Sequence, residues 1–128
     1  MILNSFVNLY HFDMPMALQE KRRVNRQVVD DYVSYAELCF QLFGDRVKKW
    51  FTHNEPIVPV EGGYMYSLHI QTKSISKKAV QVGYHELLSN AKAIAAYKKL
   101  KQDGKIGIIL NLTPILSEKP ESARREAK

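Results

Sequence analysis

The feature that most constrains the fold of this 128-residue chain is the alternation of three short apolar runs with two long segments of helical periodicity. The apolar runs cover residues 6–10, 47–52 and 106–110. The last run, IGIIL, is almost continuously apolar, which is typical of a parallel strand covered on both faces. The order strand–helix–strand–helix–strand predicts consecutive βαβ units, and therefore an α/β fold with a parallel sheet.

Both helical segments carry an apolar stripe that should face the sheet. The first helix is predicted over residues 25–43, with Asn25 as its N-cap and Gly44 as the residue after its end. Its stripe consists of Val29, Val33, Ala36, Phe40 and Phe43. The second helix is predicted over residues 76–100. Its stripe consists of Val80, Tyr84, Leu87, Leu88, Ala91, Ile94 and Ala95.

The strand and helix pattern stops before it completes an architecture. A full eight-stranded α/β barrel needs about 250 residues, and three strands alone leave two open edges and an uncovered apolar face. The pattern favours either a small three-layer α/β domain or a piece of a larger barrel. We expect residues 1–114 to form this unit and residues 115–128, which lose all periodicity, to be a disordered tail.

Charge and cysteine content narrow the possible partners. The 19 Lys and Arg against 13 Asp and Glu give a net charge of +6, and much of the excess lies in residues 71–105. These lysines are typical of the solvated face of an amphipathic helix, so no nucleic-acid partner is expected. No run approaches the roughly 18 apolar residues of a membrane span, and no signal peptide is evident. The single cysteine, Cys39, allows no intrachain disulfide, which favours a cytoplasmic location.

Polar side chains follow the predicted strand ends, where α/β barrels carry their reacting groups. His11 and Asp13 follow the first run, and Asn54 and Glu55 follow the second. Adjacent strand residues point to opposite faces, so Asn54 and Glu55 can share a site only where the strand breaks. Pro56 supplies this break and predicts an extended Glu55. A carboxyl beside an amide and an imidazole suits proton transfer to an oxygen-rich substrate, although the same residues also fit ordinary turn roles.

Other candidate residues point to structure rather than to chemistry. His53 and His69 do not match a metal-site spacing, so structural or surface roles and no metal are expected. Cys39 should be buried and inert, and Trp50 should pack in the core. Residues 56–74 are long for a loop between strand and helix, and loops of this length are often functional.

Two segments resemble signature blocks of glycoside hydrolase family 1. Residues 9–20, LYHFDMPMALQE, resemble the block that ends the third barrel strand of that family. Residues 48–64, KKWFTHNEPIVPVEGGY, resemble the T-x-N-E-P block that ends the fourth strand, and EPIVPVEGGY is similar to the bacterial 6-phospho-β-glucosidase branch. The resemblance extends over residues 6–114. It implies a partial (β/α)8 barrel, roughly strands three to five with their two connecting helices.

The resemblance also implies roles for three residues. Glu55 matches the acid/base carboxylate, which protonates the leaving glycosidic oxygen and then deprotonates water in a retaining mechanism. Asn54 matches the amide that binds the 2-hydroxyl of the sugar, and His11 matches the imidazole that contacts the 3-hydroxyl. The substrate implied for complete family members is a phosphorylated β-glycoside, with no cofactor and no metal.

The chain departs from the family pattern in several places. The family's nucleophile lies in a later T-E-N-G-type block, which does not occur in this sequence. The Gln-containing block of the first strand and the loop that grips the 6-phosphate are also absent. Residues 21–25, KRRVN, stand where the family has a Gly-Gly-Trp-like stretch. A retaining glycosidase needs two carboxyl groups about 5–5.5 Å apart, so we expect the isolated chain to be inactive.

Three hypotheses remain open at the level of sequence. The chain is a fragment of a 6-phospho-β-glucosidase, or a non-enzymatic α/β interaction module with a basic helix, or one part of an assembly in which a second fragment carries the missing barrel segments. Tight, salt-resistant binding to nucleic acid or heparin would favour the module. A neighbouring coding sequence with a T-E-N-G-type block would favour a split enzyme.

Overall fold

The computed structural model describes residues 5–20, 24–65 and 76–112. The elements in chain order are β1 (Phe6–Asn8), α1 (Met16–Glu20), α2 (Gln27–Phe43), β2 (Lys49–Asn54), α3 (Ile57–Val60), the π-helical turn η1 (Glu61–Met65), α4 (Ser76–Lys99) and β3 (Lys105–Ile109). The predicted order of three strands and two long helices is confirmed. The short helices α1, α3 and η1 were not predicted. No helix in the described ranges is long and apolar enough to span a membrane.

The three strands form one parallel sheet in the order β1-β2-β3. Phe6 pairs with Lys49, and Lys49 pairs with Lys105, so the strands start nearly level. Because all three run in the same direction, their carboxyl ends lie at one edge of the sheet. The parallel sheet predicted from the sequence is therefore confirmed.

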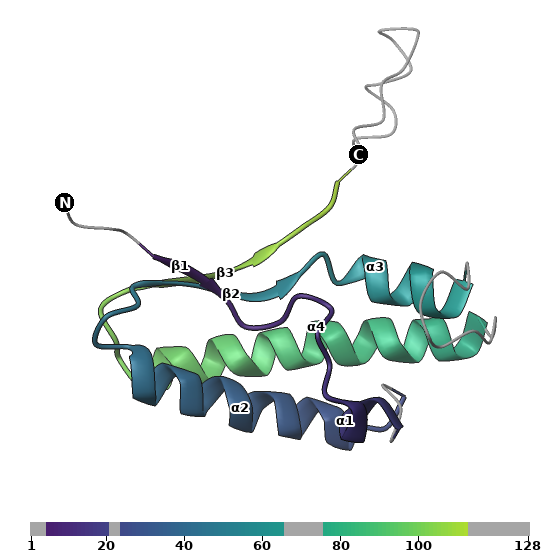
Figure 1. The fold of residues 1–128 in the computed structure, drawn as a ribbon, viewed down its shortest axis with the longest axis horizontal. Helices are drawn as coiled ribbons and strands as arrows, with labels where there is room; N and C mark the ends of the chain where they lie inside the picture. The colour runs from purple at the N-terminus through teal and green to yellow at the C-terminus, as the bar shows by residue number, and fades with distance from the viewer. Residues whose placement is uncertain (1–4, 21–23, 66–75, 113–128) are drawn as a thin grey trace, which may run out of the picture.

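Helices α2 and α4 lie side by side across one face of the sheet (Figure 1). The core between the helices and the sheet consists of Leu9, Ala36, Phe40, Val47, Trp50, Ala93 and Tyr97. Phe40 packs edge-on against Trp50 and Tyr97, with ring centroids 5.1 and 5.0 Å away. Trp50 is only 2% exposed, so its predicted place in the core is confirmed.

The predicted stripe of α2 is largely confirmed. Val29, Ala36 and Phe40 are fully buried, whereas Phe43 at the last turn is 44% exposed. The helix begins at Gln27, two residues later than predicted, but the side chain of Asn25 still accepts a hydrogen bond from the Gln27 N–H at 2.9 Å.

The role predicted for Gly44 is only partly correct. Gly44 ends α2, but its φ of −66° is right-handed and needs no glycine. A Cβ at this position would meet the side-chain amide of Gln102, which would have to move aside. Gln102 donates a hydrogen bond to the carbonyl of Phe40 at 2.6 Å, and this bond ties the end of α2 to the turn before β3.

The predicted stripe of α4 is wrong. Val80, Tyr84 and Leu87 are 75%, 60% and 59% exposed. The buried residues of α4 are Ala79, Val82, His85, Glu86, Ser89, Ala93, Ala96 and Tyr97. Most of these side chains are small or polar, which lets the helix approach the sheet and α2 closely. Val80 and Leu87 of the more apolar stripe instead line an open groove beside α3 and the segment after β3.

The segment predicted as a long loop is partly helical. Pro56 stands at the N-cap of α3 with a φ of −60°, and η1 follows directly. Val60 on α3 packs against Ala79 and Val82 of α4 in a second small core. Residues 66–74 of the predicted loop, and the predicted tail, lie outside the described residues.

The sheet face opposite α2 and α4, called the open face below, has no helix over it among the described elements (Figure 1). Phe6 and Phe51 stack on it with ring centroids 6.0 Å apart, and Phe6 is 59% exposed. The ammonium group of Lys49 lies 4.4 Å from the Phe6 ring. The uncovered apolar face expected from the strand count is thus present.

Candidate functional site

A β-bulge near the end of β2 changes the direction in which its last residues point. Phe51 pairs with Gly107 and Asn54 pairs with Ile109, so three steps along β2 match two steps along β3. An extra residue in one strand reverses the alternation of side chains beyond it. Regular alternation would place Asn54 on the helix side of the sheet. Carried past the bulge, the alternation instead points Asn54 to the face of Phe51, the open face; Asn54 itself is 9% exposed.

The two residues inside the bulge both turn to the helix layer. Thr52 donates a hydrogen bond to Asn90 of α4, and His53 contacts Ser89 of the same helix. Two successive side chains on one side are what a bulge produces. This arrangement leaves Asn54 as the last residue of β2 and Glu55 directly after it at the carboxyl edge of the sheet.

Glu55 has a backbone conformation that residues with a side chain rarely adopt. Its φ is +45°, so the predicted extended conformation is wrong. Pro56 is already the N-cap of α3, and the Glu55 N–H donates to the carbonyl of Ile109 at 2.9 Å, so the chain must turn within one residue. Such strain costs about 1–3 kcal/mol and is concentrated at functional sites. The half-buried carboxylate lies 3.5 Å from the side-chain amide of Asn111.

His11 lies at the same edge, just after β1. The preceding carbonyl, of Tyr10, accepts a hydrogen bond from the N–H of Asn54 at 2.9 Å, which brings the two strand ends together. The N–H of His11 donates to the carboxylate of Asp13 at 3.0 Å, and Phe12 between them has a φ of +66°. The structure therefore places His11, Asn54 and Glu55 at one edge, as the sequence predicts. Their catalytic and binding roles stay predictions.

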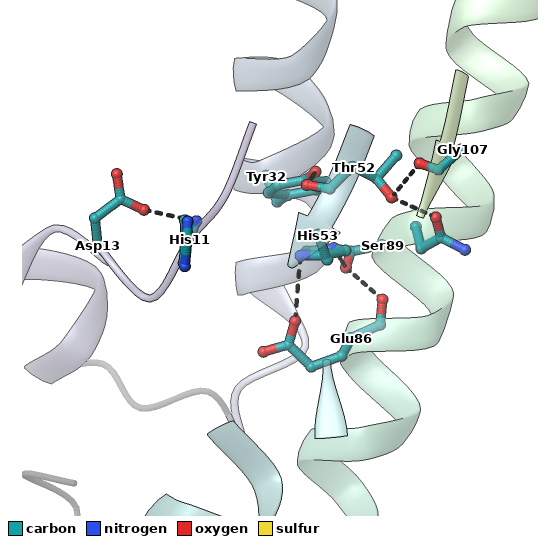
Figure 2. Close-up of polar contacts among 9 residues, drawn as sticks. His11, Asp13, Tyr32, Thr52, His53, Glu86, Ser89 and Gly107 are labelled. Atoms are coloured by element: carbon teal, nitrogen blue, oxygen red, sulfur yellow. Dashed lines mark hydrogen bonds and ion pairs between the residues drawn. The ribbon is translucent and has the colours of Figure 1, made fainter. Parts of the chain in front are cut away.

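A buried polar network that sequence reasoning missed lies between this edge and the helices (Figure 2). His53 is 3% exposed; its Nε2 lies 2.9 Å from Ser89 Oγ, and its Nδ1 lies 3.4 Å from Glu86 Oε2. The Ser89 hydroxyl also donates to the carbonyl of Glu86 at 2.8 Å. These contacts agree with the structural role predicted for His53.

Tyr32 of α2 closes the network from the other side. Its hydroxyl donates to the carbonyl of Thr52 at 2.5 Å, and its ring stacks on the imidazole of His53 with centroids 4.4 Å apart. Burial, with a smaller contribution from the charge of Glu86, raises the pKa of Tyr32 well above its ordinary value. The hydroxyl therefore stays protonated and remains a donor at any physiological pH.

A sequence signal for this network does exist. Glu86, Ser89 and Asn90 stand at positions i, i+3 and i+4, so they share one face of α4. Polar side chains that share one face of a helix are expected to have hydrogen-bond partners when that face is buried.

The remaining candidates from the sequence are Cys39 and His69. Cys39 is half-buried against the core rather than fully buried as predicted. Among residues 5–20, 24–65 and 76–112, no group of three or more His, Cys, Asp and Glu side chains could hold a metal ion. His69 lies outside the described residues.

An apolar groove of about 550 Å³ runs beside the edge, between α3, α4 and the segment after β3. The residues that line it are Pro56, Ile57, Val60, Ala79, Val80, Gly83, Leu87, Leu110, Asn111 and Leu112. Asn111 is the one polar side chain among them, so the groove suits a packed helix or strand better than a sugar. It is continuous with the exposed stripe of α4.

The parallel strands, the helices on one face and the polar residues at the carboxyl edge define a segment of a (β/α)8 barrel. Comparison with known proteins identifies the barrel. The model of glycosyl hydrolase family 1 matches residues 2–128, and the chain belongs to this family. The family resemblance read from the sequence is confirmed.

Several relatives show how much of the family fold is present. The chain is 67% identical over 113 residues to 6-phospho-beta-glucosidase GmuD of Bacillus subtilis, covering 88% of this chain and 24% of GmuD. It is 37% identical to beta-glucosidase A of Thermotoga maritima, covering 85% of this chain and 25% of that protein. The chain therefore spans about a quarter of the length of the curated relatives it matches.

Solved structures agree with this extent. The family 1 β-glucosidase of Thermotoga maritima superposes with a TM-score of 0.81 at 38% identity, over 93% of this chain and 27% of the other. The AHE enzyme of Alicyclobacillus herbarius gives a TM-score of 0.85 at 31% identity, over 97% and 28%. The described elements thus have the arrangement of the matching quarter of these proteins.

Proposed function

We propose that the chain is one part of a retaining 6-phospho-β-glucosidase, an enzyme that hydrolyses β-linked 6-phosphoglycosides. This part carries the acid/base residue of the enzyme. The observation that carries this proposal is the position of Glu55, which follows Asn54 at the carboxyl edge of a family 1 barrel segment in a strained conformation. The 67% identity to a 6-phospho-beta-glucosidase supports a phosphorylated substrate.

In this proposal each edge residue has one task. The carboxyl group of Glu55 protonates the leaving glycosidic oxygen, and its carboxylate then takes a proton from the water that attacks the sugar. Asn54, returned to the open face by the bulge, donates a hydrogen bond to the 2-hydroxyl. His11 contacts the 3-hydroxyl from the end of β1.

The proposal requires a second carboxyl group, as nucleophile, from outside this sequence. Asp13, the other acidic residue at the described edge, accepts the backbone N–H of His11 and holds the turn after β1. The missing barrel segments are accordingly the partner that we propose, with no nucleic acid and no membrane involved. We also propose a cytoplasmic location, which the single cysteine supports.

Hydrolysis of an aryl 6-phospho-β-glucoside tests the function. The purified chain should show no turnover above background. Supplying the missing barrel segments as a separate polypeptide should restore it. In that assembly Glu55→Gln should lower kcat by a factor of about 10² or more for substrates with poor leaving groups, because these need protonation.

Glu61→Gln is the matched control, since it makes the same chemical change on η1, which packs against α3 and α4 rather than against β2. It should leave turnover close to that of the unmodified assembly. Turnover by the chain alone that Glu55→Gln abolishes would contradict the need for a second carboxyl group. Equal effects of the two substitutions would contradict the role of Glu55.

A further inference from the structure

We propose that Thr52 and His53 are positioning residues, which lock the β2 bulge and thereby aim Asn54 and set the backbone of Glu55. The geometric part of this inference stands on the contacts of the described residues. Its consequence for turnover rests on the proposed function.

The first step is the attachment of the bulge to α4. Thr52 Oγ1 lies 2.6 Å from Asn90 Oδ1 and 3.2 Å from the carbonyl oxygen of Gly107. His53 reaches Ser89 and Glu86, one and four residues before Asn90. Two successive strand residues are therefore held by successive positions of one helix, and a shift of the strand by one residue would break all of these contacts.

The second step is the rigidity of the helix that holds the bulge. Ala93 and Tyr97 anchor α4 in the core beside Phe40, and Ala93 is fully buried. Ser89 and Asn90 lie one turn before Ala93, so their positions follow from core packing. The helix therefore serves as a fixed reference for the end of β2.

The bulge is also contacted from α2, by the side chain of Tyr32. A bulge leaves backbone groups without their usual partners in the strand ladder. The hydroxyl of Tyr32 satisfies the carbonyl of Thr52, and the Tyr32 ring covers His53. The bulge is thus held by side chains from both helices.

The consequence is a site geometry that depends on the network below it. If the bulge relaxed to regular alternation, Asn54 would turn towards the helices and Glu55 would lose its imposed φ of +45°. The core of Leu9, Phe40 and Trp50 would remain in place. Loss of the network should therefore disturb the edge without unfolding the domain.

Amide hydrogen exchange in the purified 128-residue chain tests the proposal. Thr52→Val removes the hydroxyl at nearly constant shape, and Thr52→Ser retains it. Thr52→Val should speed exchange at Asn54 and Glu55 about tenfold relative to Leu9, whose N–H is bonded to Phe51 before the bulge. Thr52→Ser should restore slow exchange.

Ser89→Ala provides a second variant if Thr52→Val does not fold, and it should give the same selective effect. Val47→Ala is the control for general destabilisation, because Val47 lies in the core before the start of β2. It should change the three amides equally. Equal acceleration of all three amides in Thr52→Val and Ser89→Ala would overturn the proposal.

A spectroscopic readout and a kinetic readout separate this inference from the proposed function. The three-bond coupling between the amide and α protons of Glu55 should change in Thr52→Val and return in Thr52→Ser; an unchanged value would contradict the proposal. In an assembled enzyme, Thr52→Val should lower kcat more than it raises KM. An assembly without turnover would refute the proposed function and leave the exchange result to decide the inference.

Discussion

The two faces of the sheet differ in how completely they are packed. The helix face buries Trp50 against Phe40 and Tyr97, and side chains of α2 and α4 contact Thr52 and His53. The open face carries a stacked aromatic pair, Phe6 and Phe51, with Phe6 59% exposed. Barrel interiors are filled by side chains from all eight strands, so this face needs strands that the described chain does not contain. The helix face therefore holds the segment together, and the carboxyl edge beside the open face carries the proposed chemistry.

The largest expected effect compares the same change on the two faces. Phe40→Ala should lower the free energy of unfolding by about 3–5 kcal/mol, because it empties the centre of the core. Phe6→Ala on the open face should cost less than about 1 kcal/mol. Urea unfolding of both variants measures the difference. Similar losses would mean that the open face is covered in solution.

A smaller effect compares the two sides of α4. Val82 is fully buried and Val80 is 75% exposed, although both lie on the same helix two residues apart. Val82→Ala should cost about 2 kcal/mol, whereas Val80→Ala should stay within about 0.5 kcal/mol. Thermal unfolding of the two variants checks which side of α4 is packed. The reverse order would restore the stripe predicted from the sequence.

The smallest expected effect lies at the surface of the helix layer. The Lys92 ammonium donates to Asp30 at 2.7 Å across α2 and α4, and this hydrogen bond lowers the pKa of the exposed carboxyl. A lowered pKa means that the pair stabilises the fold above the ordinary carboxyl range and loses this effect as the pH falls through it. Asp30→Asn should slightly lower the melting temperature at pH 7 and have no effect near pH 2. A loss that persists in acid would indicate packing instead.

Local sequence patterns predicted the elements well and the contacts between them poorly. The apolar runs identified the strands, and the apolar stripe of α2 identified the buried face of that helix. In both cases the apolar positions of the sequence are the ones that the fold buries. The same reasoning chose the wrong side of α4, because Val80, Tyr84 and Leu87 are more apolar than the small residues that pack. Hydrophobicity measures the free energy that is gained when a side chain is buried. It does not show which side of a helix has a neighbouring element to pack against.

The candidate site divides in the same way. The sequence placed His11, Asn54 and Glu55 at strand ends, and parallel strands alone then bring them to one edge. It could not show the bulge between Phe51 and Asn54, which exists only in the pairing of β2 with β3.

The sequence by itself determined a parallel βαβαβ segment of a family 1 barrel, since periodicity and two motif blocks are local properties of the chain. Only the tertiary structure decided how the end of β2 is aimed. Thr52 and His53 contact Asn90 and Ser89, which lie more than 35 residues later in the chain. Glu55 turns the chain because its N–H is bonded to β3 while the next residue is the N-cap of α3. These positions follow from long-range packing and hydrogen bonding, which no short stretch of sequence contains.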